Sequence, residues 1–356
     1  MYVNKLKLNY FRNYEEQELE LINGINLFLG NNAQGKTNII ESIYVSSFGK
    51  SYRAQKDSEL INFHSDFCRI DLEYYKNNIL KKNEIYIDHS KKIIQNDGIK
   101  VKKISDFIGE ILIVIFSPDS LDIVKGSPSK RREFIDMILC QLSKSYLIAS
   151  QEYMKCLKLK NAMLKKEKID REYVHILNEK MSVYIKKIVE SRKIIVEKLL
   201  NKAQIIENHL TNGKEKIDIL YHTDFLGMTE QEILNYLDEH LYIEEMRKAS
   251  IKGIQRDDFI ICINDLEVNK FGSQGQKRTA LLSLKLANFE VLKEEKNEIP
   301  ILLLDDIMSE LDNERIAFLL KYIENYQSII TTTEASFVKD IERIKILKVS
   351  NGRLEI

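Results

Sequence analysis

An eight-residue stretch near the start of the chain has the composition of a phosphate-binding loop. The stretch is GNNAQGKT, residues 30–37, and it fits the spacing G-x-x-x-x-G-K-T. The two glycines let the backbone curl so that its N–H groups can point at phosphate oxygens. The lysine supplies a cation to the β- and γ-phosphates, and the threonine hydroxyl is a ligand for Mg²⁺. The spacing therefore predicts a site for ATP and Mg²⁺.

The residues expected to hold the nucleotide are the whole loop and the residue after it. Within this set, Lys36 is also expected to act in catalysis, and Thr37 to bind the metal. A chance glycine-rich turn in front of a helix is the alternative explanation. The expected contacts are Gly30, Asn31, Asn32, Ala33, Gln34, Gly35, Lys36, Thr37 and Asn38.

A second candidate is a pair of carboxylates at the end of an apolar run. The stretch ILLLDD, residues 301–306, reads as a strand buried on both faces that ends in Asp305 and Asp306. Two carboxylates at such a position are costly unless they have a chemical role. Beside a phosphate-binding loop, Asp305 is expected to hold Mg²⁺, and Asp306 to orient or deprotonate the attacking water. A strand end that simply meets solvent is the alternative.

A third polar stretch, SQGQ at residues 273–276, stands where an apolar-periodic segment begins. Ser273 and the N–H groups after Gly275 could donate to a γ-phosphate, and a helix N-terminus favours its charge. In some ATPases with a phosphate-binding loop, such a helix start faces the nucleotide of a second subunit. An ordinary capping box is the alternative, because serine is a good N-cap and glutamine suits the third helical position. The candidate residues are Ser273, Gln274, Gly275 and Gln276.

The pattern of strands and helices around these stretches predicts an α/β fold. A strand over 25–30 precedes the loop and a helix over 37–49 follows it, which is the context that phosphate binding requires. Further along, strands are expected over 299–307 and 327–333, and a helix from Gly275 to about Glu294.

Two other regions follow different patterns. Alternating apolar and polar residues over 67–75, and a hairpin turn within 91–104, predict an antiparallel sheet beside the parallel one. Residues 127–209 are rich in Lys, Glu, Leu and Ile at helical spacing. We therefore expect an ATPase domain split over 1–124 and 251–356, with a helical insertion at 125–250.

Composition limits the function only weakly. Lys and Arg total 54, as do Asp and Glu, so the net charge of zero gives no bulk signal for nucleic acid, although a local basic face stays possible. The four cysteines lack CxxC spacing, which favours free thiols in a reducing cytosol over a zinc site. The N-terminus alternates like a strand rather than a signal peptide, and runs such as ILIVIF (111–116) are too short to span a bilayer. A cytoplasmic protein is expected.

With these motifs in place, the chain resembles the RecF family, ATPases of bacterial DNA replication and repair related to the heads of SMC proteins. The resemblance is spread over most of the chain. The block SPSKRREFID is the more discriminating one, because many unrelated proteins share a phosphate-binding loop. The blocks that carry it are NYFRNY (9–14), GNNAQGKTNIIESIY (30–44), KSYRAQKDSELI (50–61), FSPDSLDIVKGSPSKRREFID (116–136), FGSQGQKRTALLSLKLA (271–287) and LLLDDIMSELD (302–312).

The resemblance implies an ABC-type ATPase head, in which a mixed sheet with the phosphate-binding loop joins an antiparallel subdomain, with an inserted helical lid domain. It implies that Arg12 and Asn13 approach the nucleotide; a surface charge at a strand end is the alternative for Arg12. It also implies that SELD (309–312) meets a partner subunit. One threonine of the run 331–333 is expected to sense the γ-phosphate.

Two departures from the family pattern affect the expected site. The family's G-P-H-R-D-D block is GIQRDD here (253–258), with Ile254 and Gln255 in place of Pro and His, so no histidine role carries over. Transporter-type relatives have Glu where this chain has Asp306. Because an aspartate side chain is one methylene shorter, we expect a weak ATPase. The resemblance to the family further implies that DNA stimulates it.

The resemblance further implies an ATP-dependent homodimer that binds double-stranded and gapped DNA, with RecR as a partner and RecO and RecA in the same pathway. No membrane partner is expected. A second lysine-rich run (155–168) could also meet DNA, with a solvated helix face as the alternative. A transporter ATPase subunit and a small-molecule kinase with the same loop remain the alternative functions. The candidate DNA contacts are Lys125, Lys130, Arg131 and Arg132.

Overall fold

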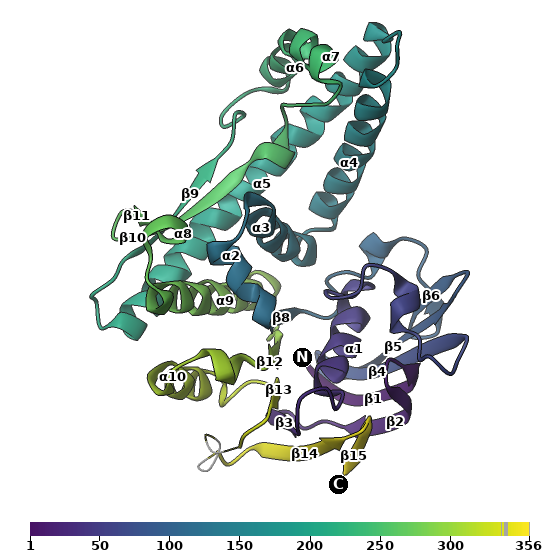
Figure 1. Ribbon diagram of the computed structural model, residues 1–356, viewed down its shortest axis with the longest axis vertical. Coiled ribbons are helices and arrows are strands. Elements are labelled where there is room, and N and C mark those ends of the chain that lie inside the picture. Colours follow the sequence, from purple (N-terminus) through teal and green to yellow (C-terminus); the bar gives the residue numbers. More distant parts are fainter. Residues whose placement is uncertain (336, 338–340, 356) are drawn as a thin grey trace. The chain divides into compact units, whose positions relative to one another are not determined.

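The computed structural model describes residues 1–335, 337 and 341–355. The chain forms two compact units, Met1–Ser120 with Asn288–Ile356, and Leu121–Ala287 (Figure 1). The first boundary lies near the expected one at 124/125, whereas the second falls at 287/288 instead of 250/251. The expected domain limits stay a prediction, because compactness does not show which segment folds independently.

The first unit contains a six-stranded sheet that is parallel except for its C-terminal hairpin. Four of its five parallel strands are short, mostly apolar and buried, which is expected where both faces of a parallel sheet are covered. Asp305 ends one of them, and the loop at 30–35 follows another. The strand order is β15 (Arg353–Glu355), β14 (Ile344–Ser350), β3 (Ile25–Leu29), β13 (Ser328–Thr332), β12 (Ile301–Asp305) and β8 (Ile113–Phe116).

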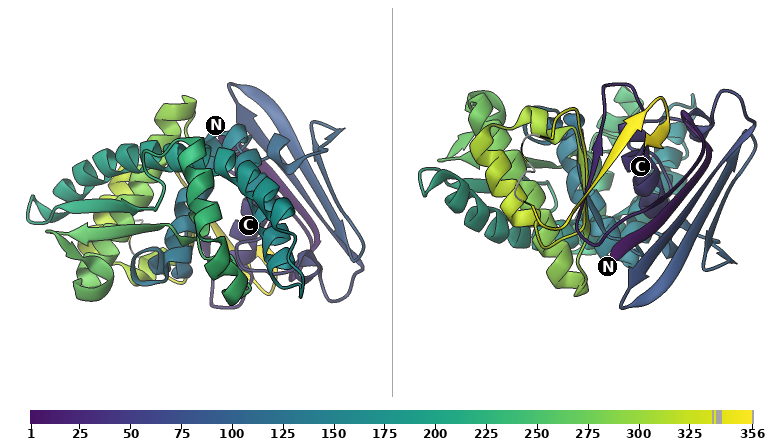
Figure 2. Two further views of the ribbon diagram at one scale, coloured as in Figure 1. Left: turned by 90° about the horizontal axis from the view of Figure 1, so that it is seen from above. Right: turned by 90° about the horizontal axis from the view of Figure 1, so that it is seen from below.

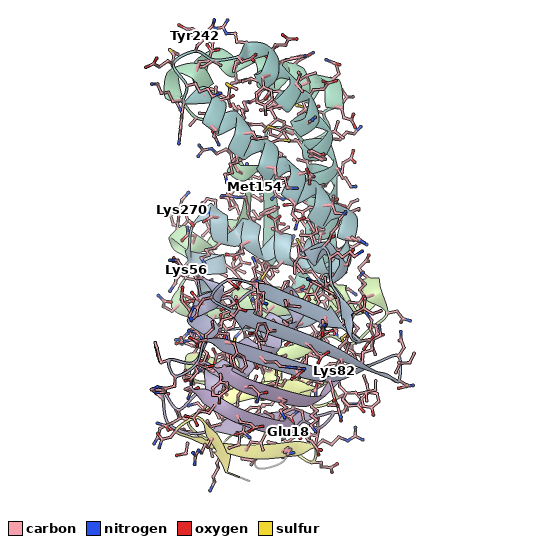
Figure 3. The ribbon with its side chains drawn as sticks, turned by 90° about the vertical axis from the view of Figure 1, so that its right-hand side faces the viewer. Glu18, Lys56, Lys82, Met154, Tyr242 and Lys270 are labelled. Carbon is pink, nitrogen blue, oxygen red and sulfur yellow. The ribbon has the colours of Figure 1, made fainter. Side chains whose placement is uncertain are left out.

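A second six-stranded sheet in this unit is antiparallel. Its exposed face carries charged side chains, among them Glu18 and Lys82 (Figure 3). They form ion pairs with Lys5 at 2.5 Å and with Glu84 at 3.0 Å. The expected hairpin turn lies between its last two strands. The strand order is β2 (Tyr14–Glu20), β1 (Tyr2–Phe11), β4 (Phe67–Lys76), β5 (Ile79–Asp88), β6 (Lys92–Asn96) and β7 (Ile99–Lys100).

Helix α1 (Lys36–Phe48) contacts strands of both sheets, which explains why it is buried on nearly every side. Glycines in the left-handed conformation bound it at both ends, Gly35 and Gly49. Helix α10 (Asn313–Ile323) packs on residues 288–296 through Phe289 and Tyr322. Short 3₁₀ turns complete this unit at Asp57–Leu60, Ile104–Asp106 and Ile307–Glu310, and another, Pro118–Leu121, leads into the second unit.

The second unit is mainly helical. Its longest helix, α5 (Arg171–Thr211), is capped by Asp170 and packs along α4 (Lys144–Leu164) (Figures 1 and 2). The remaining helices are α2 (Asp122–Lys125), α3 (Pro128–Leu142), α6 (Glu230–Glu239), α7 (Leu241–Arg247), α8 (Val268–Phe271) and the first part of α9 (Gln274–Lys296).

A three-stranded antiparallel sheet also belongs to this unit, in the order β11 (Leu266–Glu267), β10 (Asp258–Ile263) and β9 (Ile217–His222). A 3₁₀ turn, Ile254–Arg256, leads into β10. β9 follows the block at 127–209 that the sequence predicts to be helical, and the sequence patterns predict no strand there. Over the part of the chain that the structure describes, no helix has both the length and the apolar character to cross a membrane.

Candidate nucleotide-binding site

The loop at 30–35 joins β3 to α1 and is tightly enclosed. A Cβ atom on Gly30 would lie 2.4 Å from the Val349 carbonyl oxygen, and one on Gly35 would lie 2.5 Å from the Asn13 amide. Gly35 also has φ of +110°, which favours glycine. Packing within this unit therefore requires glycine at both glycine positions of the G-x-x-x-x-G-K-T spacing.

The Lys36 side chain folds back over the loop. Its Nζ donates to the carbonyl oxygens of Gly30 at 2.5 Å and Asn31 at 2.8 Å. Burial lowers the pKa of Lys36, while Asp306 and Asp305 act in the opposite direction. The ammonium group thus lies over the loop, on the side where those two carboxylates stabilise its charge.

Asp305 meets the first helical turn of α1. Its Oδ1 accepts hydrogen bonds from the hydroxyls of Thr37 and Thr331, each at 2.8 Å. A third hydroxyl, that of Tyr52, donates to Oδ2 at 3.0 Å. The Thr37 hydroxyl and the Asp305 carboxylate are hard oxygen ligands, and Mg²⁺ commonly takes only one or two such protein ligands beside water and phosphate. The residues present therefore fit Mg²⁺.

Asp306 follows in a left-handed conformation with φ of +52°. Its N–H donates to the Thr331 hydroxyl at 3.0 Å, so Thr331 contacts both carboxylate residues. Burial raises the pKa of Asp306, with Lys36 opposing the rise. Of the three threonines considered for γ-phosphate sensing, Thr331 is the one that touches these aspartates, whereas Thr332 bonds to the Glu334 carbonyl.

Arg12 is held beside α1 rather than left as a free surface charge. It is also in the left-handed region, and its Nε and Nη2 donate to both oxygens of buried Glu41, at 2.9 and 2.7 Å. The Ser51 hydroxyl donates to the same carboxylate at 2.5 Å, and Arg53 lies 3.7 Å from it. The sequence patterns predict no role for Glu41, Ser51 or Tyr52, although the last two lie in the family-like block KSYRAQKDSELI.

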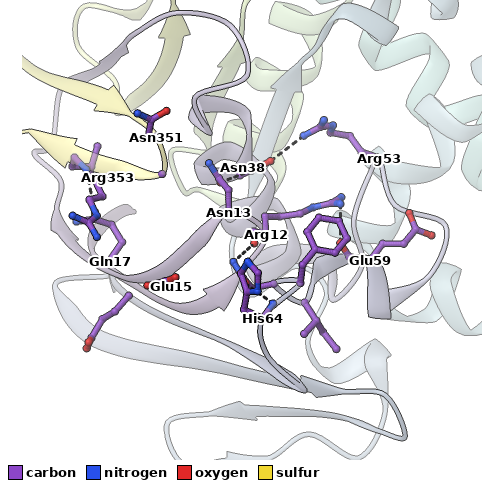
Figure 4. Close-up of a pocket in the computed structure, with 16 residues that line it drawn as sticks. Arg12, Asn13, Glu15, Gln17, Asn38, Arg53, Glu59, His64, Asn351 and Arg353 are labelled. Carbon is purple, nitrogen blue, oxygen red and sulfur yellow. Dashed lines mark hydrogen bonds between the residues drawn. The ribbon is translucent and has the colours of Figure 1, made fainter.

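A polar pocket of about 850 Å³ opens next to the loop (Figure 4). Asn13 forms part of its wall: its amide donates to the Gln34 carbonyl at 3.1 Å and accepts from the Asn38 amide at 2.7 Å. Phe63 lines the opening and is fully exposed. A pocket of this volume is in the range that binds small ligands.

In the second unit, the SQGQ stretch forms the capping box that its sequence predicts. The Ser273 N–H donates to the Gln276 side chain at 2.9 Å, and the Gln276 N–H donates to the Ser273 hydroxyl at 3.2 Å. Ser273 and Gln274 are exposed at this helix start. The cap therefore coexists with an accessible N-terminus, as an anion site requires.

The four cations considered for DNA have different environments. Lys125 and Lys130 are exposed, with acidic neighbours 3.7 and 3.6 Å away. Arg131 is buried, and its guanidinium donates to both oxygens of Asp258 at 2.7 and 2.9 Å. Arg132 donates to the Asp257 carbonyl at 2.7 Å. Arg131 is therefore withdrawn as a DNA contact, because its donors hold this unit together.

The GIQRDD block is also integrated into the second unit. Buried Arg192 donates to the Asp257 carboxylate at 2.7 Å and to the Ile254 carbonyl at 3.1 Å. Gln255, which replaces the family's histidine, accepts a hydrogen bond from the Tyr153 hydroxyl. Ile254 and Gln255 thus have packing and hydrogen-bonding roles here, and Arg256 is the exposed member of the block.

Comparison with known proteins agrees with this geometry. A family model described as RecF/RecN/SMC N terminal domain matches residues 2–355. Proteins named DNA replication and repair protein RecF are similar over their whole length: that of Clostridium novyi is 40% identical and that of Clostridium acetobutylicum 39%, each with 99% of both chains covered.

Solved structures are similar as well. One of RecF with ATPrS, described as a recombination mediator protein in the RecFOR pathway, superposes with a TM-score of 0.93 at 35% identity, covering 99% of this chain and 97% of that one. An SMC head bound to a domain of ScpA gives 0.59 at 16% identity, covering 100% and 96%, which supports the fold alone.

Proposed function

The chain belongs to the RecF family of DNA replication and repair proteins, within the ABC/SMC-type ATPases, and from this premise we propose that it is an ATP-dependent DNA-binding protein that dimerises when it binds ATP. The observation that carries the proposal is the contact of Thr37 with Asp305, which joins the phosphate-binding loop to the carboxylate pair. A relative with the same fold has been solved with ATP.

In this proposal the loop from Gly30 to Asn38 holds the phosphates, and Lys36 leaves its carbonyl partners to meet them. Thr37 and Asp305 would hold Mg²⁺, which neutralises phosphate charge when bound. Asp306 orients the attacking water or takes its proton. The raised pKa of Asp306 brings this carboxyl nearer to neutral pH, which suits a general base.

The pocket of Figure 4 would receive the nucleoside, because it opens beside Asn38 and Asn13 where the loop meets α1. Exposed Phe63 could stack on the base. The bidentate pair with Glu41 would fix Arg12 at the side of this pocket.

The dimer rests on the exposed start of α9. Ser273, with the N–H group of Gly275, would bind the γ-phosphate held by a second copy, so that ATP lies between two chains. ATP then favours the dimer, and hydrolysis removes that preference. The SELD segment would meet the partner near the same nucleotide.

The test is gel filtration of the Asp306→Asn variant, in which we expect slow hydrolysis to trap an ATP-dependent dimer. Adding Ser273→Arg should abolish dimerisation while each monomer still binds ATP. A dimer that persists after this change would overturn the composite site, and a chain that stays monomeric with ATP would favour a kinase.

DNA binding would use backbone phosphates, with exposed Lys125 and Lys130 as candidate contacts. Duplex and gapped DNA are the proposed substrates, and RecR, with RecO and RecA, the proposed partners in loading recombinase at gaps. Such a role places the protein in the cytoplasm. A transporter subunit would lack ATPase stimulation by duplex DNA, so a membrane-free assay with gapped and intact duplex separates the two functions, and an affinity independent of salt would contradict phosphate contacts.

A further inference from the structure

The Asp305 carboxylate has more hydrogen-bond donors than its proposed role as a metal ligand explains. Thr37 is expected to turn its hydroxyl to Mg²⁺, which leaves Oδ1 bonded to Thr331 and Oδ2 bonded to Tyr52. One donor on each oxygen fixes the plane of a carboxylate, whereas a single donor leaves it free to rotate. With the Tyr52 hydroxyl removed, Thr331 would be the one donor left to orient Asp305 among the residues that the structure describes.

Tyr52 is itself firmly placed. Its ring lies edge-on against Tyr44, with ring centroids 5.0 Å apart. The turn that carries it is closed by Ser51, whose hydroxyl accepts the N–H groups of Arg53 and Ala54 at 2.8 Å each and donates to Glu41. The hydroxyl of Tyr52 therefore reaches Asp305 from a turn that hydrogen bonds hold in place. This turn is separate from both β12 and the phosphate-binding loop.

We propose that Tyr52 is a positioning residue for the magnesium site, which acts by holding Oδ2 of Asp305. The proposal rests on the proposed ATPase function, because it assumes that Asp305 and Thr37 hold the metal. Groups that orient metal-binding carboxylates commonly change metal affinity by about 10- to 100-fold when they are removed. Tyr52 would thus set how much Mg²⁺ the protein needs to bind nucleotide tightly.

The test is the Tyr52→Phe variant, which removes one hydroxyl and keeps the ring against Tyr44. Binding of a fluorescent ATP analogue is titrated with Mg²⁺ and, separately, measured in EDTA. We expect the Mg²⁺ concentration for half-maximal binding to rise about tenfold, with the affinity in EDTA unchanged. A half-point equal to that of the unchanged protein would overturn the proposal.

A matched control is Tyr221→Phe in the second unit. The Tyr221 hydroxyl donates to the carboxylate of Asp257 at 2.7 Å, so the same kind of bond is lost away from the proposed ligands. This variant should lower the melting temperature without moving the Mg²⁺ half-point. A shift of equal size in both variants would show a general loss of stability and would also overturn the proposal.

Thr331→Val is the second test variant, and it covers the case in which Tyr52→Phe fails to fold. It removes the donor on Oδ1, so we expect the same direction of shift in the Mg²⁺ half-point, and no shift would contradict the role of orientation. The failure of the proposed function looks different: the unchanged protein would then bind the ATP analogue equally well with and without Mg²⁺.

Discussion

At the scale of single residues, Gly352 shows how the C-terminal hairpin supports the phosphate-binding loop. Its N–H donates to the Gln34 carbonyl at 3.0 Å, and the Asn351 N–H donates to the Gln34 side chain at 2.6 Å. Gly352 has φ of +70°, and a Cβ atom there would lie 2.4 Å from the Asn13 carbonyl oxygen. The turn between β14 and β15 therefore packs against the phosphate-binding loop and supports it. The sequence of the loop alone does not reveal this contact.

We predict that Gly352→Ala weakens ATP binding, because the added methyl group pushes the hairpin turn away from Asn13 and Gln34. Gly98→Ala is the matched control: that glycine is also in a hairpin turn, with φ of +77°, but has no atom within 4 Å of the added Cβ. Both variants should lose about 1 kcal/mol of stability from backbone strain. Only Gly352→Ala should show a several-fold higher Kd for ATP by calorimetry. Equal Kd values in the two variants would contradict the support of the loop by the β14–β15 turn.

At the scale of elements, Arg192 joins α5 to α3 and to the segment before β10. Its guanidinium meets Asp136 at 2.9 and 3.0 Å and Asp257 at 2.7 Å, and both Arg192 and Asp257 are buried. Burial raises the pKa of Asp257, while Arg192 opposes that rise. Arg192 therefore supplies the positive charge that pairs with the buried Asp257 carboxylate.

We therefore expect Arg192→Ala to cost about 3–5 kcal/mol in urea unfolding, the usual result of leaving a buried charge without its partner. Arg171→Ala on the same helix is the control. Arg171 pairs with Glu245 at 2.7 Å, but at an exposed position, where solvent screens the attraction. Arg171→Ala should therefore lower the free energy of unfolding by only a small fraction of the decrease in Arg192→Ala. Decreases of similar size in the two variants would show that burial does not decide the effect.

Helix α9 carries a buried lysine that should make stability depend on pH. Lys285 lies 5.3 Å from the centre of the Phe134 ring, and burial lowers its pKa to about 7, with Glu133 acting in the opposite direction. In the unfolded chain the lysine has its usual pKa of 10.5. Between these values the unfolded state binds one more proton than the folded state, so stability rises with pH across this window and is lowest below pH 7.

We predict that Lys285→Met removes this slope. Urea unfolding of the unchanged protein should gain about 1 kcal/mol per pH unit from pH 7 to 9 relative to the variant. The variant should be the more stable of the two at pH 7, which is the end of this range where burial of the lysine costs most. A difference between the proteins that stays constant over this range would contradict the assignment.

Local patterns predicted the elements that build the site, and they did so for physical reasons. β3, α1, β12 and the cap of α9 follow from short periodic runs with glycine, aspartate or serine at their ends, and each lies within a few residues of its predicted limits. Such signals depend on neighbours in the chain. They are therefore readable without knowledge of the tertiary fold.

Contacts between distant residues could not be predicted in this way. Asp305 meets Tyr52 from 253 positions away, and Arg131 meets Asp258 from 127. Periodicity describes only which face of an element a residue occupies, so a run of cations predicts a DNA contact at Arg131 without revealing its pairing with Asp258. β9 was missed for the same reason: its partner β10 lies some forty residues further along the chain, and its own six residues carry little signal.

At the scale of the whole molecule, the proposed site is divided between chains. Lys36 and Asp305 would serve the nucleotide of their own chain, whereas Ser273 would serve that of the partner. A two-fold dimer then contains two identical sites, each with residues from both copies. A site shared in this way predicts a result that a site contained within one chain cannot give.

We predict that two inactive variants restore activity when they are mixed. Lys36→Ala lacks the cation of the loop, and Ser273→Arg lacks the donor and blocks the partner's phosphate, so neither should hydrolyse ATP alone.

In a mixed dimer, one site combines the intact loop of the Ser273→Arg chain with the intact Ser273 of the Lys36→Ala chain, while the other site carries both defects. Because neither variant alone should form the ATP dimer, the dimers that form are mixed and each has one working site of two, so ATPase activity should return to at most about half of the unchanged level. A tag on one variant should also recover the other only when ATP is present. If Ser273 served its own chain instead, every site in the mixture would keep a defect, and mixing would restore neither activity nor association.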